Sequence, residues 1–311
     1  MIASPRQSRP SGAVRPSLHG LLLLDKPLGM TSQTAVSRLK RLLAVRKAGH
    51  TGTLDPLATG LLPICVGEAT KFSHLLLEAE KGYEAEIRLG VTTTTGDLEG
   101  ETLSISPVDV DSHRAQEVLA RFVGESEQVP PMFSAIKQRG RPLYELARQG
   151  ITVPRAARRI HIGELGLVEL AGATLHVKVT CGKGTYVRVL AEGIGKALGC
   201  GASLAALRRT GVGGFRVSDA ISLERIEEMP SPTREGSLLC MDAPLAGLPR
   251  VDVDTEQARG LVQGQPVQAG PQDAAGLVRL YESVSGRFLG VGMRGLGGRI
   301  APRRLVSGPT H

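Results

Sequence analysis

The segment from Gly49 to Gly60, GHTGTLDPLATG, limits the possible backbone conformations of this chain more than any other segment does. Glycine allows backbone conformations and close approaches that a Cβ atom would prevent. Pro56 fixes its own φ and biases Asp55 towards an extended conformation. The segment therefore predicts a loop that holds one carboxylate in a defined place. An active site and an ordinary turn capped by aspartate both fit this pattern, and the local sequence leaves both interpretations open.

The bulk composition excludes several classes of protein. A chain of 311 residues can form one large domain and a small one without disulfide support. No run of eighteen apolar residues is present, so no membrane-spanning helix is expected. Residues 1–17 lack the apolar core of a secretory signal and predict a disordered basic leader. The cysteines form no C-x-x-C pair, which predicts buried thiols in a reducing cytoplasm and no zinc site.

The charge distribution points to an acidic partner. Net charge is +8 and the isoelectric point about 9.6, which is typical of proteins that bind nucleic acid or membrane surfaces. The window 38–47 holds five basic residues and no acid, and the window 137–159 holds seven with one acid. Solvated faces would explain such runs, but two in one chain favour a phosphate backbone. The expected backbone contacts are Arg38, Arg41, Arg46, Lys47, Lys137, Arg139, Arg141 and Arg148.

Hydrophobic periodicity predicts a mixture of helices and strands without a regular βαβ repeat, hence an α+β fold. Strands are expected at 20–24, 83–89 and 175–181, and helices at about 32–43 (capped by Thr31 or Ser32), 70–79, 112–122 and 186–198. Residues 128–150 mix prolines, glycines and basic residues, which predicts a surface excursion with little core. From about residue 244, short strands and many glycines predict a small β-rich module.

The sequence contains few candidate catalytic residues. No P-loop, H-E-x-x-H or EF-hand pattern is present, and no metal-ligand set accompanies Asp55. The candidates near it are polar residues with ordinary structural interpretations. His50 suits a loop hydrogen bond and Tyr83 suits core packing. Arg188, which follows Tyr186 at a predicted helix start, suits a surface charge or a guanidinium that pairs with a carboxylate.

Several long motifs, in one order, resemble the TruB family of bacterial tRNA pseudouridine-55 synthases. They are LLLLDKPLGMTS, AGHTGTLDPLATGLLPICVGEATKFS, GYEAEIRLGV, PPMFSAIKQRGRPLYELARQGI, CGKGTYVRVLAEGIGKALGCGASLAALRR, and RFLGVG with GRIAPRRL. The resemblance covers about residues 18–310. It implies a pseudouridine synthase core, with a mixed and largely antiparallel sheet and flanking helices, at 18–243. It further implies an RNA-gripping insertion at about 128–150 and a PUA-like RNA-binding domain at 244–311.

The resemblance also implies roles for individual residues. Asp55 falls on the family's catalytic aspartate, and Arg188 falls on the arginine that pairs with it. Such a guanidinium is expected to lower the pKa of the aspartate. The implied substrate-binding residues are His50 beside the flipped nucleotide, Tyr83 stacked on the target base, Tyr186, Arg188 and Leu207.

The chain departs from the family pattern in two places. Relatives often carry T-D-T-x-D, whereas this chain has Thr93 to Asp97 as T-T-T-G-D, with Thr94 in place of the first aspartate. The family's L-R-R-L, taken as a helix end, is here Leu207 to Thr210. Both departures affect expected local RNA contacts and neither touches Asp55.

The reaction implied by the resemblance is an isomerisation of uridine in the T-loop of tRNA, after the base is flipped out of its stack. It requires no cofactor and no metal, and the expected partner is the T-arm stem-loop of tRNA in the cytoplasm, without a membrane or an obligate protein partner. Three alternatives stay open. They are a non-catalytic RNA-binding or RNA-folding protein, a relative guided by small RNAs, and a glycoside hydrolase. The last usually needs two placed carboxylates, and the sequence offers no second one like Asp55.

Overall fold

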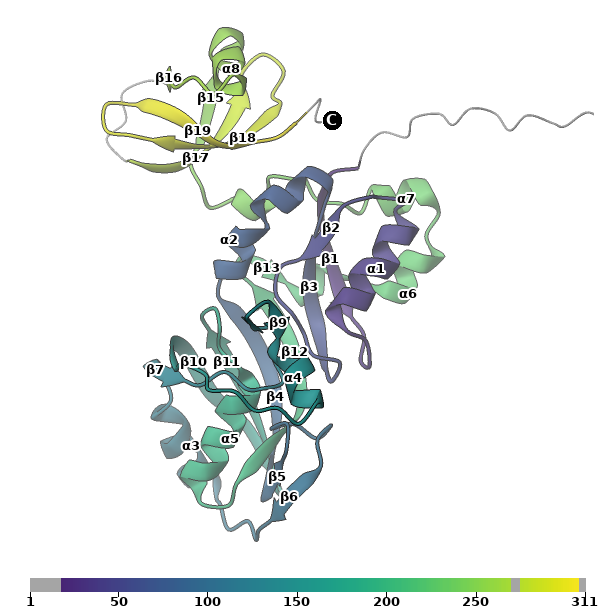
Figure 1. Ribbon diagram of the computed structural model, residues 1–311, viewed down its shortest axis with the longest axis vertical. Helices are drawn as coiled ribbons and strands as arrows, with labels where there is room; N and C mark the ends of the chain where they lie inside the picture. Colours follow the sequence, from purple (N-terminus) through teal and green to yellow (C-terminus); the bar gives the residue numbers. More distant parts are fainter. Residues whose placement is uncertain (1–17, 270–274, 308–311) are drawn as a thin grey trace, which may run out of the picture.

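The computed structural model describes residues 18–269 and 275–307 (Figure 1). The leader expected at 1–17 lies outside these residues. The division between 243 and 244 stays a prediction. Among the described residues, no helix is long and apolar enough to span a bilayer.

A ten-stranded sheet runs through the larger part of the molecule. Its order is β14-β1-β3-β12-β4-β11-β10-β7, with β2 on β3 and β13 on β12. Only β1–β14 and β3–β12 pair in parallel; the other pairs are antiparallel, so the predicted α+β class with a mixed sheet is confirmed. The strands are β1 (Gly20–Lys26), β2 (Ala48–His50), β3 (Ala58–Val66), β4 (Lys81–Leu89), β7 (Gly124–Gln128), β10 (Arg158–Ala171), β11 (Thr174–Cys181), β12 (Ala202–Val212), β13 (Phe215–Arg216) and β14 (Ile221–Ser222).

Helices flank this sheet, with α1 and α6 beside one half and α3 and α5 beside the other (Figure 1). Thr31 caps α1, as predicted, by accepting a hydrogen bond from the Thr34 amide at 3.0 Å. The helix expected at 70–79 is instead a 3₁₀-helix followed by a short α-helix. Ala69 and Phe72, three residues apart, are both buried, and this spacing suits a 3₁₀ turn. The helices are α1 (Ser32–Leu42), η1 (Gly67–Phe72), α2 (Ser73–Glu78), α3 (Ser112–Ala120), α5 (Val187–Leu198), η2 (Val217–Asp219), α6 (Leu223–Glu228), α7 (Ser231–Glu235) and η3 (Ala243–Leu245).

The leucine side chains of β1 point alternately to the two faces of the sheet and belong to two different cores. Leu22 and Leu24 join the main core with residues of α1, α3, α5 and α6. Leu21 and Leu23 join a second core with Phe72. Successive side chains of a strand point to opposite faces, so both faces of the sheet are covered here.

The central strands β3 and β12 were missed by sequence periodicity. In β3 nearly every residue is buried, so its sequence ATGLLPICV shows no alternation. The expectation that Leu207 to Thr210 ends a helix is wrong, because these residues lie inside β12. There Leu207 pairs with Ala58 of β3 and with Ala85 of β4. A strand hydrogen-bonded on both sides cannot end a helix at the same residues.

The insertion at 128–150 has more structure than expected. It contains β8 (Lys137–Gln138), β9 (Arg141–Pro142) and α4 (Leu143–Arg148). Leu143 and Leu146 of α4 are buried, so the expectation of little core needs correction. A separate hairpin, β5 (Val91–Thr93) with β6 (Thr102–Ile105), frames the loop that holds Asp97.

The C-terminal part is β-rich, as predicted, and contains a helix that was not predicted. Its sheet has the order β15-β17-β18-β19-β16. Asp254 and Gln257 form a capping box at the start of α8. The rings of Phe72 and Phe288 lie 5.6 Å apart and join this module to the second core. The elements are β15 (Arg250–Val253), α8 (Thr255–Val262), β16 (Val267–Gln268), β17 (Gly276–Glu282), β18 (Phe288–Arg294) and β19 (Arg299–Leu305).

Candidate active site

The Asp55 loop connects β2 to β3, and two of its features require glycine. Gly52 has φ +129° and Gly60 has φ +99°, values that favour glycine. A Cβ atom at Gly60 would lie 2.3 Å from the carbonyl oxygen of Arg209, so the close approach excludes any side chain. Ser32 holds the loop from α1, because its hydroxyl accepts from the Leu54 amide at 2.8 Å and donates to the Leu54 carbonyl at 3.0 Å. The backbone around Asp55 is therefore fixed from two sides.

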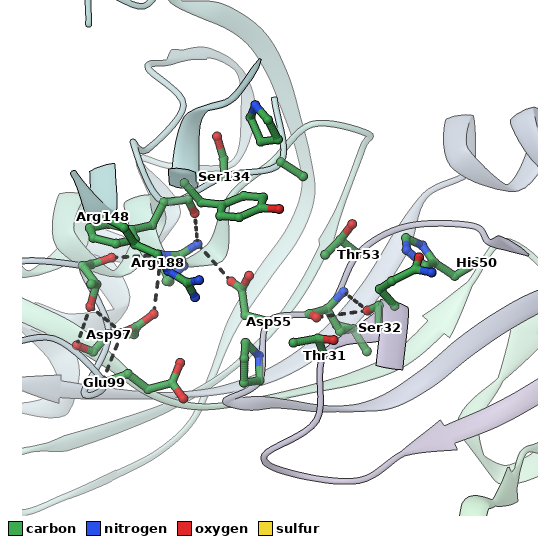
Figure 2. A pocket seen from close by; sticks show the side chains of 18 of the residues that line it. Thr31, Ser32, His50, Thr53, Asp55, Asp97, Glu99, Ser134, Arg148 and Arg188 are labelled. Carbon is green, nitrogen blue, oxygen red and sulfur yellow. Dashed lines mark hydrogen bonds and ion pairs between the residues drawn. The ribbon is translucent and has the colours of Figure 1, made fainter. Parts of the chain in front are cut away.

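Asp55 lies between two cavities. The larger, of about 590 Å³, is lined by His50, Asp97 and Arg148 among others (Figure 2). The smaller, of about 260 Å³, is lined by aromatic and apolar residues, among them Tyr83, Tyr186 and Leu207, and by several charged and hydroxyl side chains. Asp55 and Arg188 line both. The structure thus gathers the predicted catalytic and substrate-binding residues from four distant segments.

Arg188 contacts several groups of this site. Its guanidinium contacts the Asp55 carboxylate at 3.0 Å, so the predicted pairing is present. It also donates to the backbone carbonyls of Thr95 at 3.1 Å and Phe133 at 2.7 Å. Its side chain is 6% exposed, whereas that of Asp55 is 43% exposed. The buried guanidinium therefore holds the carboxylate where it lines both cavities.

Two opposing influences set the pKa of Asp55. Burial raises the pKa of this carboxyl above 3.8, and the nearby Asp97 adds to the increase. Arg188 lowers the pKa of Asp55, as expected, but the effect of burial is larger. The expected effect of Arg188 is therefore present, but burial disfavours the charged form more than the guanidinium favours it.

A second carboxylate accompanies Asp55, contrary to the sequence-based expectation. Asp97 is buried and lies 3.5 Å from the same guanidinium. It accepts hydrogen bonds from the Thr95 hydroxyl and from the Glu99 amide. Thr94, which replaces the family's aspartate, accepts from the Glu101 amide at 3.1 Å, so this loop keeps a side-chain acceptor at that position.

The smaller cavity presents a buried tyrosine. Tyr83 lies on β4, and its hydroxyl lies close to the guanidinium of Arg209, which also lines this cavity. Arg209 is fully buried and donates to the carbonyls of Leu61 at 2.6 Å and Gly52 at 3.1 Å. Burial raises the pKa of Tyr83 and of Tyr186. Both phenols are therefore neutral at physiological pH, and Arg209 holds the Asp55 loop through the Gly52 carbonyl.

Models of one protein family match consecutive parts of the chain. Residues 40–187 match the TruB family pseudouridylate synthase N-terminal domain, and residues 188–246 match the tRNA pseudouridylate synthase B C-terminal domain. Residues 249–306 match the pseudouridine synthase II TruB C-terminal model. The chain belongs to the TruB family. The resemblance noted in the sequence is thus confirmed.

Curated relatives support this assignment over most of the chain. "tRNA pseudouridine synthase B" of Aromatoleum aromaticum is 52% identical, covering 93% of this chain and 92% of the relative. The protein of the same name from Dechloromonas aromatica is 53% identical, covering 92% and 95%. Among solved structures, a chain of a Cbf5–Nop10–Gar1 complex is 27% identical, with a TM-score of 0.68, covering 90% of this chain and 79% of its own length. These relatives share the pseudouridine synthase fold.

His50 of this TruB protein lines the larger cavity and not the smaller one. Burial, together with the charge of Arg209, lowers the pKa of His50 below 6.5. Its buried Nδ1 has no hydrogen-bond partner among the described residues. A neutral imidazole therefore lines the cavity that Asp55 also lines, and its expected role beside a flipped nucleotide stays a prediction.

The eight basic residues expected to contact RNA are all exposed, but only some of them line the larger cavity. Lys137 and Arg148 line it, and the Arg148 guanidinium lies 5.6 Å from the Tyr144 ring. Arg38, on α1, forms an ion pair with Glu227 instead. The members that lie outside the cavity lining are Arg38, Arg41, Arg46, Lys47, Arg139 and Arg141.

Sequence reasoning missed a buried cation near the Asp55 loop. Lys26, at the end of β1, donates to the carbonyls of Pro27 at 2.8 Å and Met30 at 2.6 Å. Burial lowers the pKa of Lys26 to about 8, although the nearby Asp55 opposes the decrease. A lysine two residues after a run of four leucines, within the same expected strand region, was the signal that could have identified it.

Proposed function

We propose that this chain converts uridine 55 in the T-loop of tRNA to pseudouridine, with Asp55 as the catalytic carboxylate. One observation carries the proposal: in a TruB-family chain, Arg188 holds Asp55 between two cavities, the smaller of which offers an aromatic wall for a base. The curated relatives are named as tRNA pseudouridine synthases, which supports tRNA as the substrate.

The proposed reaction breaks the bond between C1′ and N1 and forms one between C1′ and C5. N1 gains a proton and C5 loses one, so the product is an isomer and no external oxidant or reductant takes part. The target base must first leave its stack, at a cost of a few kcal/mol. Stacking on an aromatic face offsets about 1–3 kcal/mol of this cost, and Tyr83 supplies that face.

Asp55 acts in its ionised form in every version of this chemistry. Attack on the sugar, attack on the base and removal of a sugar proton all require the carboxylate. Arg188 favours that form against the effect of burial. His50, in the larger cavity, is placed to hold the displaced loop of the RNA.

We further propose that the enzyme recognises the T-arm without a guide RNA or a protein partner, in the cytoplasm. The relatives that are about half identical are named for tRNA, and they align over almost their full length. The similar structure taken from a complex with other proteins is only 27% identical. The buried free thiols of Cys65, Cys181 and Cys200 suit a reducing compartment.

The deciding experiment incubates the pure protein with a uridine-labelled T-arm transcript and analyses the nucleotides. Pseudouridine is expected at position 55, and a transcript with cytidine at that position serves as the control. Binding without product would favour an RNA-binding protein. Product only after addition of a guide RNA would favour the guided class, and release of free uracil would favour a hydrolase.

Replacing Tyr83 separates stacking from the hydroxyl group. Tyr83→Leu is expected to slow single-turnover conversion by about 5- to 150-fold, which corresponds to the 1–3 kcal/mol of one base stack. Tyr83→Phe keeps the ring and is expected to stay within a few-fold of wild type. Equal rates for the two variants, after correction for thermal stability, would contradict a stacking role.

Phosphate contacts in the cavity are tested by salt dependence. Lys137→Ala combined with Arg148→Ala is expected to reduce the slope of log Kd for tRNA against log salt by about 1.5, or roughly 0.7–0.9 per lost contact. Arg225→Ala, an exposed substitution on α6, is the matched control. An unchanged slope in the double variant would show that neither residue binds a phosphate.

A further inference from the structure

The side chain of Gln128 is held against the residue that begins the active-site helix. Gln128 ends β7 and is 7% exposed. Its Nε2 donates to the Tyr186 carbonyl at 3.1 Å, and its Oε1 accepts from the Tyr186 amide at 2.8 Å. One carboxamide therefore satisfies both backbone groups of a residue that is distant in sequence, as a neighbouring strand would.

This contact fixes the start of α5. Tyr186 is the N-cap residue of that helix, and its carbonyl also accepts the first helical hydrogen bond, from the Leu190 amide at 3.1 Å. No side chain of the helix caps this end. Arg188 is the second residue of α5, so the placement of its guanidinium follows from the placement of Tyr186.

We propose that Gln128 is a positioning residue for the isomerisation. Its carboxamide holds the Tyr186 backbone so that the Tyr186 side chain lines the smaller cavity and Arg188 reaches Asp55. The inference rests on the proposed function, because it concerns the same site. It assigns to Gln128 no contact with RNA.

The chemistry of the side chain supports this role. Glutamine carries a donor and an acceptor on one planar group, whereas an ionised glutamate can only accept and leucine can do neither. Loss of the bond to Oε1 leaves the partly buried Tyr186 amide without this partner, and loss of the bond from Nε2 leaves the Tyr186 carbonyl with the Leu190 amide alone. Phe133, five residues further along the insertion, accepts from Arg188 at 2.7 Å. The insertion that carries Lys137 and Arg148 is thus attached to the active-site helix at two points.

The experiment compares Gln128→Glu and Gln128→Leu with wild type in single-turnover conversion of the T-arm transcript. Both variants are expected to react about 10- to 100-fold more slowly, because small displacements of catalytic groups have effects of this size. Their affinity for tRNA is expected to stay close to wild type. Gln116→Glu, an exposed substitution on α3 that adds the same charge, is the control.

The rate–pH profile supplies a readout that a purely structural role would not change. If Arg188 moves away from Asp55, the pKa of Asp55 rises, and the acid limb of the profile moves to higher pH. In the double variant of Gln128→Glu and Arg188→Lys, the loss of rate is expected to be smaller than the sum of the two single losses. Both substitutions disturb the same interaction between Arg188 and Asp55.

Three results would overturn the inference: a wild-type rate and pH profile in Gln128→Glu, losses that add fully to those of Arg188→Lys, or a rate that falls only as far as the folded fraction measured by thermal melting. Failure of the proposed function looks different. In that case wild type and Gln116→Glu also yield no pseudouridine, and the inference falls with it.

Discussion

Asp55→Asn is expected to lower the rate of pseudouridine formation by at least about 1,000-fold while tRNA binding persists, since positioned carboxylates acting on protons alone contribute up to about 10⁴-fold. The amide keeps the shape of the side chain but carries no negative charge. The Asp55 side chain is 43% exposed at the junction of the two cavities, so it is not a core residue. The fold is expected to survive the change.

The measurement pairs single-turnover conversion with a binding assay on the same T-arm transcript. Asp109→Asn, an exposed substitution of the same kind, is the control and is expected to match wild type. Conversion by Asp55→Asn at more than a tenth of the wild-type rate would exclude Asp55 as the catalytic group. An RNA-folding protein would instead retain its whole function in this variant.

Arg188→Ala is expected to affect stability and rate together. Asp97 is buried and shares this guanidinium, so the variant leaves an unpaired buried charge. Breaking a buried pair in this way costs about 3–5 kcal/mol. Addition of Asp97→Asn is expected to recover part of this loss, because it removes the unpaired charge. Urea unfolding of the two variants measures the difference, and equal stability would show that Asp97 does not depend on Arg188.

The pH dependence of Arg188→Ala has a definite sign. Asp55 must be ionised, so the rate falls as pH drops through its pKa. Burial already raises that pKa above 3.8, and Arg188 opposes the increase. Without the guanidinium the pKa rises further, and the acid limb of the rate–pH profile moves to higher pH. Arg188→Lys keeps the charge and is expected to shift the limb less. An unmoved limb in Arg188→Ala would exclude this electrostatic role.

The elements that sequence predicted well are those with a clear hydrophobic period. In β4, buried Tyr83, Ala85 and Ile87 alternate with exposed Glu84 and Glu86, so one face of the strand is visible in the sequence. In β3 both faces are buried and the alternation disappears. α8 was missed because the short, glycine-containing segment around it reads as loop, although Asp254 and Gln257 carry its capping signal.

Some residues of the candidate site could be predicted from the local sequence and others could not. The glycines around Asp55 and the proline after it are local signals, and they indicated a fixed loop before any fold was known. The roles of Tyr83, Tyr186 and Leu207 came from family resemblance, because each has an ordinary packing interpretation when taken alone. Asp97 was not among the predicted site residues, because nothing in its sequence neighbours shows that it shares Arg188 with Asp55.

The sequence by itself determined the class of fold, the family, and the glycine-framed loop that presents Asp55. These depend on local conformational preferences and on the order of motifs along the chain. The tertiary structure decided the environment of that carboxylate. Burial outweighs Arg188 in setting the pKa of Asp55, and Arg188 is itself held by Thr95 and Phe133. Desolvation and hydrogen bonding depend on which distant segments meet around a group, so they exist only once the chain has folded.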